Sequence, residues 1–216
     1  MVATFVLIHG SYQGGWIWKP VAARLRRDGH LVFAPSLDGC GERAAQQRPG
    51  ITTETQAGEV AGFLWAEDLR DVILVGASSG GMVMAKTAEL ARERVARLVF
   101  LDALALRHGE CIRDIVAGSM RVRTEYASGP TRDERLQRFL LDMDPDLAEW
   151  AADRSTLHPI GVSTEPWNWR SSGPRRGTCR WSSAAGPESR GRPTSAAPPR
   201  RSAPAGTSST PATTRC

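Results

Sequence analysis

Residues 71–94 read Asp-Val-Ile-Leu-Val-Gly-Ala-Ser-Ser-Gly-Gly-Met-Val-Met-Ala-Lys-Thr-Ala-Glu-Leu-Ala-Arg-Glu-Arg, a pattern that predicts a strand, a sharp turn and a helix. The apolar run 72–75 contains β-branched side chains and is typical of a strand buried on both faces. From Gly81 onward, apolar residues recur at roughly helical spacing. Between the two lies Gly76-Ala77-Ser78-Ser79-Gly80, a Gly-x-Ser-x-Gly sequence with Ser78 at the tip of the turn.

The Gly-x-Ser-x-Gly spacing has a physical reason. A chain that passes from strand to helix within about one residue forces Ser78 into a strained backbone conformation. Gly76 and Gly80 have no Cβ, so the strand and the helix can pass close to each other. The turn presents the Ser78 hydroxyl at a helix N-terminus, where the dipole favours developing negative charge. This context indicates a nucleophile elbow rather than an ordinary turn, and Ser78 is the candidate nucleophile.

Length, charge and cysteine content limit the class of protein. A chain of 216 residues is expected to form one domain around a single core. It begins directly with a strand, has no signal-peptide pattern and contains no segment apolar enough to span a bilayer. Its four cysteines lack metal or redox spacing. We therefore expect a cytoplasmic protein with reduced thiols, no membrane association, no metal and no organic cofactor; oligomeric state is not predicted.

The net charge of +5 is unevenly distributed. Residues 166–216 contain nine arginines and one glutamate, a net charge of +8, so the preceding residues carry a net charge of −3. A mildly acidic body lacks the basic surface that nucleic-acid binding requires. We expect a small-molecule substrate and no nucleic-acid partner.

Strands and helices alternate along the first half of the chain. The pattern predicts strands at 4–8, 31–34, 72–75 and 98–101, and helices at 16–27, at 54–65 and from Gly81. This alternation implies right-handed crossovers and a mostly parallel sheet with flanking helices, an α/β fold. Ligands of such sheets bind beyond the carboxyl ends of the strands. Ser11, Ser78 and Asp102 all fall at that edge.

The sequence divides into three regions. Residues 1–103 form the N-terminal part of the α/β core. Residues 104–165 show helical periodicity and no convincing strand, which predicts a helical cap that shapes a substrate pocket; a helical subdomain with only a packing role is the alternative. Residues 166–216 contain no Val, Ile, Leu, Met, Phe, Tyr, Lys or Asp, and are predicted to be a disordered tail.

Four motifs together resemble the α/β-hydrolase fold: His9-Gly10-Ser11, Gly14-Gly15-Trp16-Ile17-Trp18, Leu37-Asp38-Gly39-Cys40-Gly41 and the elbow. The sequence is most similar to the small cytosolic branch with methyl esterases, hydroxynitrile lyases and bacterial relatives, over about residues 2–165. The resemblance implies a serine hydrolase acting on a small ester or related carbonyl compound. It also implies an oxyanion hole made by the backbone N–H groups of Ser11 and Ser79. The turn at Gly10 and the helix N-terminus at Ser79 would both direct donors toward Ser78.

The remaining partners of a catalytic triad are less evident. Asp102 ends a strand at the correct edge and is a candidate acid, although it could equally satisfy loop N–H groups. His9 lies on the oxyanion turn, where a structural role is favoured over that of a base. His158, in the cap, could reach the site, whereas His30 and His108 are expected to be solvated or structural.

A hydrolase of this fold needs a histidine base after its last strand, and no histidine follows residue 158. The tail could be a natural extension, but we favour a coding frame displaced by one base. Residues 167–169 must be encoded as TGG-AAY-TGG, and the frame one base earlier reads an apolar residue, Glu and Leu, a sensible helix start. The C-terminal strands and the histidine would then be missing or replaced.

Three functional hypotheses follow. The first is a serine hydrolase of the α/β-hydrolase fold that is impaired, and in effect truncated, because its C-terminal histidine is absent. The second is a hydroxynitrile-lyase-type C–C lyase. The third is a non-catalytic, α/β-hydrolase-like binding protein. In each case the missing strands would leave an open sheet edge with uncovered apolar surface, which favours aggregation.

Overall fold

The computed structural model describes residues 2–104, 106–115 and 122–168, all of which fall in one compact unit, Met1–Gly177. Of the predicted out-of-frame tail at 166–216, residues 169–216 lie outside the described residues. Among the helices of the described ranges, none combines the length and the apolar character that a bilayer span needs.

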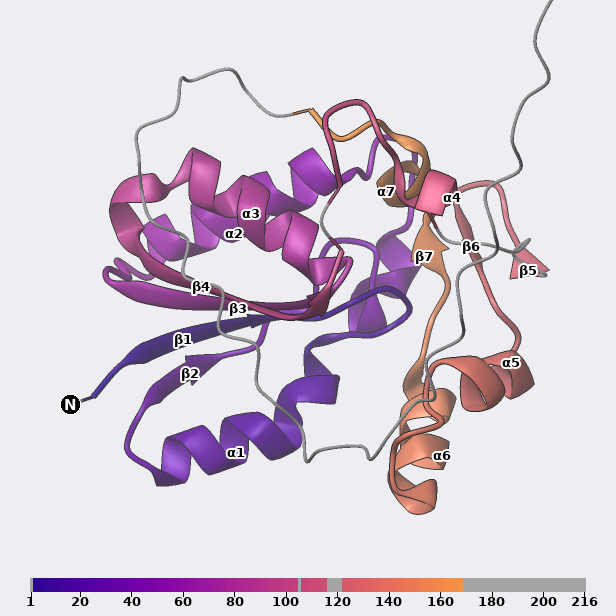
Figure 1. Cartoon of the computed structure of the whole chain (residues 1–216), viewed down its shortest axis with the longest axis horizontal. Helices are drawn as coiled ribbons and strands as arrows, with labels where there is room; N and C mark the ends of the chain where they lie inside the picture. Colours follow the sequence, from indigo (N-terminus) through magenta and orange to yellow (C-terminus); the bar gives the residue numbers. More distant parts are fainter. Residues whose placement is uncertain (1, 105, 116–121, 169–216) are drawn as a thin grey trace, which may run out of the picture. The chain divides into compact units, whose positions relative to one another are not determined.

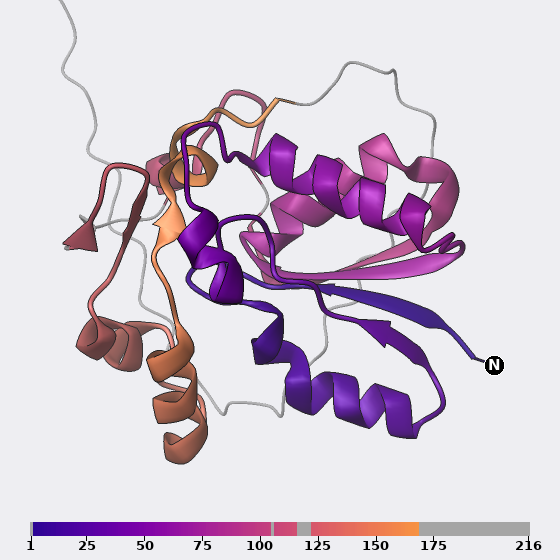
Figure 2. The same ribbon diagram turned by 180° about the vertical axis from the view of Figure 1, so that it is seen from behind.

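A four-stranded parallel sheet forms the centre of this unit. Its strands are β1 (Thr4–Ile8), β2 (Leu31–Phe33), β3 (Val72–Ser78) and β4 (Val95–Ala103), in the order β2-β1-β3-β4. Helices α2 (Thr53–Ala66) and α3 (Gly80–Leu90) cover one face of the sheet, and α1 (Lys19–Arg27) covers the other (Figures 1 and 2). Short 3₁₀ segments occupy Gly15–Trp18, Gly41–Gln46 and Arg92–Arg94. The predicted α/β fold with a parallel sheet is confirmed.

Alternating side chains of the two central strands fill two separate apolar layers. Val6, Ile8 and Leu74 pack on the α2 and α3 side. Leu7 and Val75 pack on the opposite side, with Trp18 and Ala22. Because a strand that is buried on both faces has no polar side, its sequence reads as a continuous apolar run, and this is why β1 and β3 were predictable.

The elbow depends on close contacts between backbones. A Cβ placed on Gly80 would lie 2.5 Å from the carbonyl oxygen of His9, and one on Gly76 would lie 2.7 Å from that of Gly80. A Cβ on Gly81 would lie 2.5 Å from the Ala103 Cβ. These three glycines therefore let α3 start directly against β1, β3 and the end of β4.

The cap differs from the prediction in its secondary structure. Besides the helices α4 (Ile112–Ile115), α5 (Arg132–Arg138), α6 (Pro145–Arg154) and α7 (Ile160–Thr164), it contains a three-stranded sheet in the order β5-β6-β7. These strands, Val122–Arg123, Ala127–Gly129 and His158–Pro159, pair antiparallel. The expectation of a cap without strands is therefore wrong. Strands of two or three residues are too short to produce a period-two pattern, so they are defined by their pairing, which for β6 and β7 joins segments about 30 residues apart.

The cap packs on the core through aromatic rings and backbone contacts. The rings of Trp16 and Trp150 meet edge to face with centroids 5.2 Å apart. The backbone N–H of Thr156 donates to the carbonyl oxygen of Tyr12 at 2.9 Å. Trp167, which the sequence grouped with the tail, is only 4% exposed and packs with the Lys86 ammonium 5.1 Å from its ring centroid.

Strand β4 is an edge of the sheet in the described part of the chain. Phe100 and Leu101 on this strand are 38% and 41% exposed, whereas the neighbouring β3 residues Leu74 and Val75 are buried. An edge strand that carries exposed apolar side chains is a template for pairing with another chain.

We expect Leu101→Lys to slow aggregation several-fold in light scattering, because a charge on the edge opposes strand pairing. The free energy of unfolding should change by no more than about 0.5 kcal/mol. Val21→Lys on α1 is the matched control, since Val21 is 44% exposed and α1 contacts β2, the strand at the opposite edge of the sheet. Equal effects of the two substitutions would show that the edge does not drive aggregation.

We expect Gly80→Ala to lower the free energy of unfolding by about 1–3 kcal/mol in urea titrations, because the added methyl group would overlap the His9 carbonyl. Gly58→Ala in α2 is the control. Nothing lies within 4 Å of its added Cβ, so it should stabilise the protein by about 0.5–1 kcal/mol. A Gly80→Ala protein as stable as Gly58→Ala would contradict this account of the elbow.

Candidate active site

A cavity of about 610 Å³ opens at the carboxyl edge of the sheet. Its core side is formed by the turn after β1, the elbow and the end of β4, and its other side by the cap. Ser11, Ser78 and Asp102, which the sequence placed at this edge, all line it. Ser78 is exposed toward this space, whereas Ser79 and Gly76 beside it are buried. Ser11, Ser78 and Asp102 are thus brought together around one cavity.

Backbone strain is concentrated at this cavity. Five non-glycine residues in the described chain have φ in the left-handed region, and three of them line the cavity: Tyr12 (68°), Ser78 (49°) and Asp102 (42°). Such conformations cost about 1–3 kcal/mol each and persist where the surroundings hold them. The predicted strain at Ser78 is confirmed.

The turn after β1 lies directly against the elbow. A Cβ on Gly10 would lie 3.0 Å from the Cβ of Ser78, so any side chain there would push the two turns apart by a few tenths of an ångström. The hydroxyls of Ser11 and Ser79 are 2.9 Å apart and hydrogen-bonded. The Gly10 N–H donates to the side-chain oxygen of Gln13 at 3.1 Å, which fixes the turn. Ser11 is therefore held against Ser79, the residue that follows Ser78.

Asp102 reaches the cavity through a bulge in β4. Ala77 pairs with Leu101 and Ser78 pairs with Ala103, so Asp102 is the extra residue between them. The backbone N–H of Leu104 then donates to the Ser78 carbonyl oxygen at 3.0 Å. A bulge re-aims the side chain that it carries, and here it turns Asp102 into the cavity beside Ser78.

His9 is fully buried and bonded through both ring nitrogens. Its Nδ1 lies 2.8 Å from the Gly10 carbonyl oxygen, and its Nε2 accepts from the Leu37 N–H at 3.0 Å. Burial lowers the pKa of His9 to about 4, so the ring is neutral at neutral pH. His9 connects the turn after β1 to the loop after β2, which is the structural role that the sequence favoured.

His158 lies in β7, 2% exposed, outside the cavity lining. Its Nδ1 is 3.5 Å from the Cys40 sulfur, and its ring stands edge to face with Tyr12 at 6.0 Å. Burial lowers the pKa of His158 to about 3 and raises that of the Cys40 thiol to about 12, so both groups are neutral. All four histidines lie in the described part of the chain, and none of them lines the cavity.

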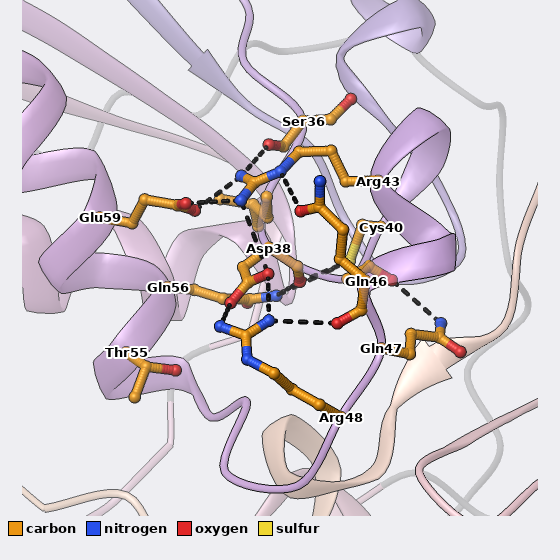
Figure 3. Close-up of polar contacts among 12 residues, drawn as sticks. Ser36, Asp38, Cys40, Arg43, Gln46, Gln47, Arg48, Thr55, Gln56 and Glu59 are labelled. Carbon is orange, nitrogen blue, oxygen red and sulfur yellow. Dashed lines mark hydrogen bonds and ion pairs between the residues drawn. The ribbon is translucent and has the colours of Figure 1, made fainter.

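An ionic network holds the loop after β2 against α2 (Figure 3). Asp38, 6% exposed, receives two hydrogen bonds from Arg48 at 2.9 and 2.7 Å. Arg43 forms a bidentate pair with Glu59 of α2 at 2.8 and 2.6 Å. Arg43 also donates to the Ser36 carbonyl oxygen at 3.1 Å, and the Ser36 hydroxyl accepts from the Gly15 N–H at 2.7 Å, so the network reaches the 3₁₀ segment that follows the Ser11 turn.

The cavity also contains residues that the sequence analysis did not select. Gln13 and Tyr12 belong to the first turn, and four arginines come from the cap: Arg113, Arg123, Arg135 and Arg138. Arg135 and Arg138 share the three-residue spacing of one helix face, which was the available signal. That signal did not reveal which face of α5 meets the cavity.

Comparison with known proteins places the chain among hydrolases. The model of the alpha/beta hydrolase family matches residues 5–206, a range that extends into the predicted tail. A carbendazim-hydrolysing esterase of Nocardioides sp. (strain SG-4G) is 43% identical over 130 residues, which is 59% of this chain and 54% of the esterase. An α-hydroxynitrile lyase of Arabidopsis thaliana is 33% identical over 100 residues, 46% of this chain and 39% of the lyase.

A comparison with solved structures also finds an α/β-hydrolase. An extracellular α/β-hydrolase from a Paenibacillus species, described as sharing structural and functional homology with tobacco salicylic acid binding protein 2, superposes with a TM-score of 0.64 at 26% identity. The superposition covers 77% of this chain and 71% of that protein. The chain spans about half the length of the carbendazim esterase and less of the lyase. On the family match and on its fold, this chain belongs to the α/β-hydrolase family.

Proposed function

We propose that this chain carries the nucleophile and the oxyanion hole of an esterase for small ester or related carbonyl substrates, without the histidine base. The observation that carries this proposal is Ser78 itself. It stands at left-handed φ, faces a cavity and has Gly10 in contact and Ser79 adjacent. The similarity to a carbendazim-hydrolysing esterase supports an ester-like substrate.

In the proposed reaction, the Ser78 hydroxyl oxygen attacks the carbonyl carbon of the ester and gives up its proton to a base. The backbone N–H groups of Ser11 and Ser79 stabilise the resulting oxyanion, each by about 3 kcal/mol. The tetrahedral intermediate then expels the alcohol and leaves an acyl group on Ser78. Attack by water releases the carboxylic acid and restores the serine.

The proposed reaction lacks a general base among the residues that line the cavity. A serine hydroxyl is a weak nucleophile until a histidine takes its proton, and a positioned base contributes about 10²–10⁴-fold in rate. Asp102 would orient such a histidine in a complete enzyme, so by itself it cannot replace one. We therefore infer turnover far below that of a complete esterase.

Two other functions remain alternatives. The similarity to a hydroxynitrile lyase makes C–C cleavage the alternative reaction, in which serine relays a proton and no acyl-enzyme forms. A burst of alcohol release from an activated ester, equal to the enzyme concentration, would favour the esterase. The missing base also fits a non-catalytic binding protein, for which ligand affinity should be unchanged in Ser78→Ala.

Added imidazole should restore esterase activity, because the open cavity admits a small base beside Ser78. With 4-nitrophenyl acetate, we expect the enzyme-dependent rate to rise at least about tenfold with imidazole, a part of what a positioned base contributes. The rise should follow the free-base fraction of imidazole, which increases through a pKa near that of histidine, about 6.5.

Ser78→Ala is the control, because imidazole hydrolyses this ester slowly on its own. Identical imidazole-dependent rates for the wild type and Ser78→Ala would exclude Ser78 as the nucleophile. Rapid turnover without imidazole that disappears in His158→Ala would show instead that His158 is the base.

A further inference from the structure

The cap side of the cavity is cationic. Arg113 comes from α4, Arg123 from β5, and Arg135 and Arg138 from α5. The carboxylates on the cavity lining are Asp102 and Asp142, so four arginines face two aspartates. Arg132, one turn before Arg135, differs from them: it lies outside the cavity lining and pairs with Glu149 and Asp153.

Arg135 forms no ion pair with a carboxylate of the described residues, although Asp102 and Asp142 line the same cavity. Its terminal nitrogen donates to the Ser155 carbonyl oxygen at 2.9 Å, and its buried Nε has no hydrogen-bond partner among the described residues. Burial lowers the pKa of Arg135, but a guanidinium stays charged at neutral pH. A half-buried cation bonded only to a neutral carbonyl is poorly compensated, and an anionic ligand would improve its environment.

Tyr12 connects these charges to the reactive serine. It follows Ser11 in sequence, and its ring stands edge to face with Phe139 at 5.8 Å. Burial raises the pKa of Tyr12 to about 12, and the charges of Arg135 and Arg138 oppose this rise. The positive charge therefore acts on the residue next to the proposed oxyanion donor, inside the cavity that contains Ser78.

We propose that the substrate of this site is an ester that carries a carboxylate, such as the half-ester of a small dicarboxylic acid, and that Arg135 binds that carboxylate. The inference rests on the proposed function for the identity of the reacting group. A planar carboxylate matches the guanidinium fork in two parallel hydrogen bonds. Asp102 and Asp142 offset part of the positive charge, which favours a single negative charge over a doubly charged phosphate group. A cavity of about 610 Å³ is large enough for such a ligand.

The test measures binding by calorimetry to the full chain with Ser78→Ala, so that no turnover is needed. We expect monomethyl glutarate to bind at least about tenfold more tightly than dimethyl glutarate, and this preference to shrink as salt is added. Arg135→Met should remove the preference and leave dimethyl glutarate affinity within about twofold. Arg132→Met, which changes a neighbouring arginine outside the cavity, should leave both affinities unchanged.

Arg123→Met serves as a second cavity variant, because Arg123 is exposed and its loss should leave the fold intact. This substitution should weaken binding of the half-ester and leave binding of the diester unchanged. The proposal is overturned if the two esters bind equally, or if neither binds. It is also overturned if methyl phosphate binds more tightly than the half-ester, or if Arg132→Met loses the preference for the half-ester as fully as Arg135→Met does. Failure of the esterase proposal would give a different result from failure of the carboxylate proposal. Imidazole-dependent turnover of 4-nitrophenyl acetate would then be absent, whatever the half-ester affinity.

Discussion

The close approach of three backbones at the elbow is the constraint on which the rest of the site depends. Gly80 lies so near the His9 carbonyl that no side chain fits between α3 and β1. Because the helix must begin there, Ser78 has no room for an ordinary strand or helix conformation and takes φ of 49°. The same approach brings Gly10 and Ser11 beside Ser78. The position of the proposed nucleophile and the proposed oxyanion geometry are thus one consequence of backbone packing.

The part of the fold that creates this geometry lies within the first 103 residues, whereas a base would come from elsewhere. His9 and the network of Asp38, Arg43 and Glu59 hold the two loops around Ser78 through contacts within the first 103 residues. Preorganised donors retain their orientation whether or not a proton acceptor is present. This separation explains how a chain without a histidine at its site can still present a strained, exposed serine.

Much of the core could be predicted, since strands buried on both faces and the glycines of the elbow leave strong local signals. Strand β4 was predicted too short, because Arg97 interrupts its apolar pattern; an edge strand tolerates such a residue. The strands of the cap could not be predicted, since each has only two or three residues and is defined by its pairing, in a short hairpin for β5 and β6 and across the cap for β7. The arginines at the cavity escaped prediction because nothing local separates Arg135, which faces the cavity, from Arg132, which pairs with carboxylates outside it.

Binding and chemistry would use different parts of this cavity, and the two need not fail together. An arginine that holds a remote carboxylate interacts equally with the substrate and the transition state, so it strengthens binding without accelerating the chemical step. The N–H groups of Ser11 and Ser79 would act mainly on the oxyanion that forms during the reaction, and they raise the rate only when a base lets Ser78 attack. Absence of a base would therefore remove the benefit of the oxyanion hole first and would leave the proposed recognition of the anion intact. On this argument, a chain with this site would persist as a selective binder of carboxylate-bearing esters even where its turnover is slow.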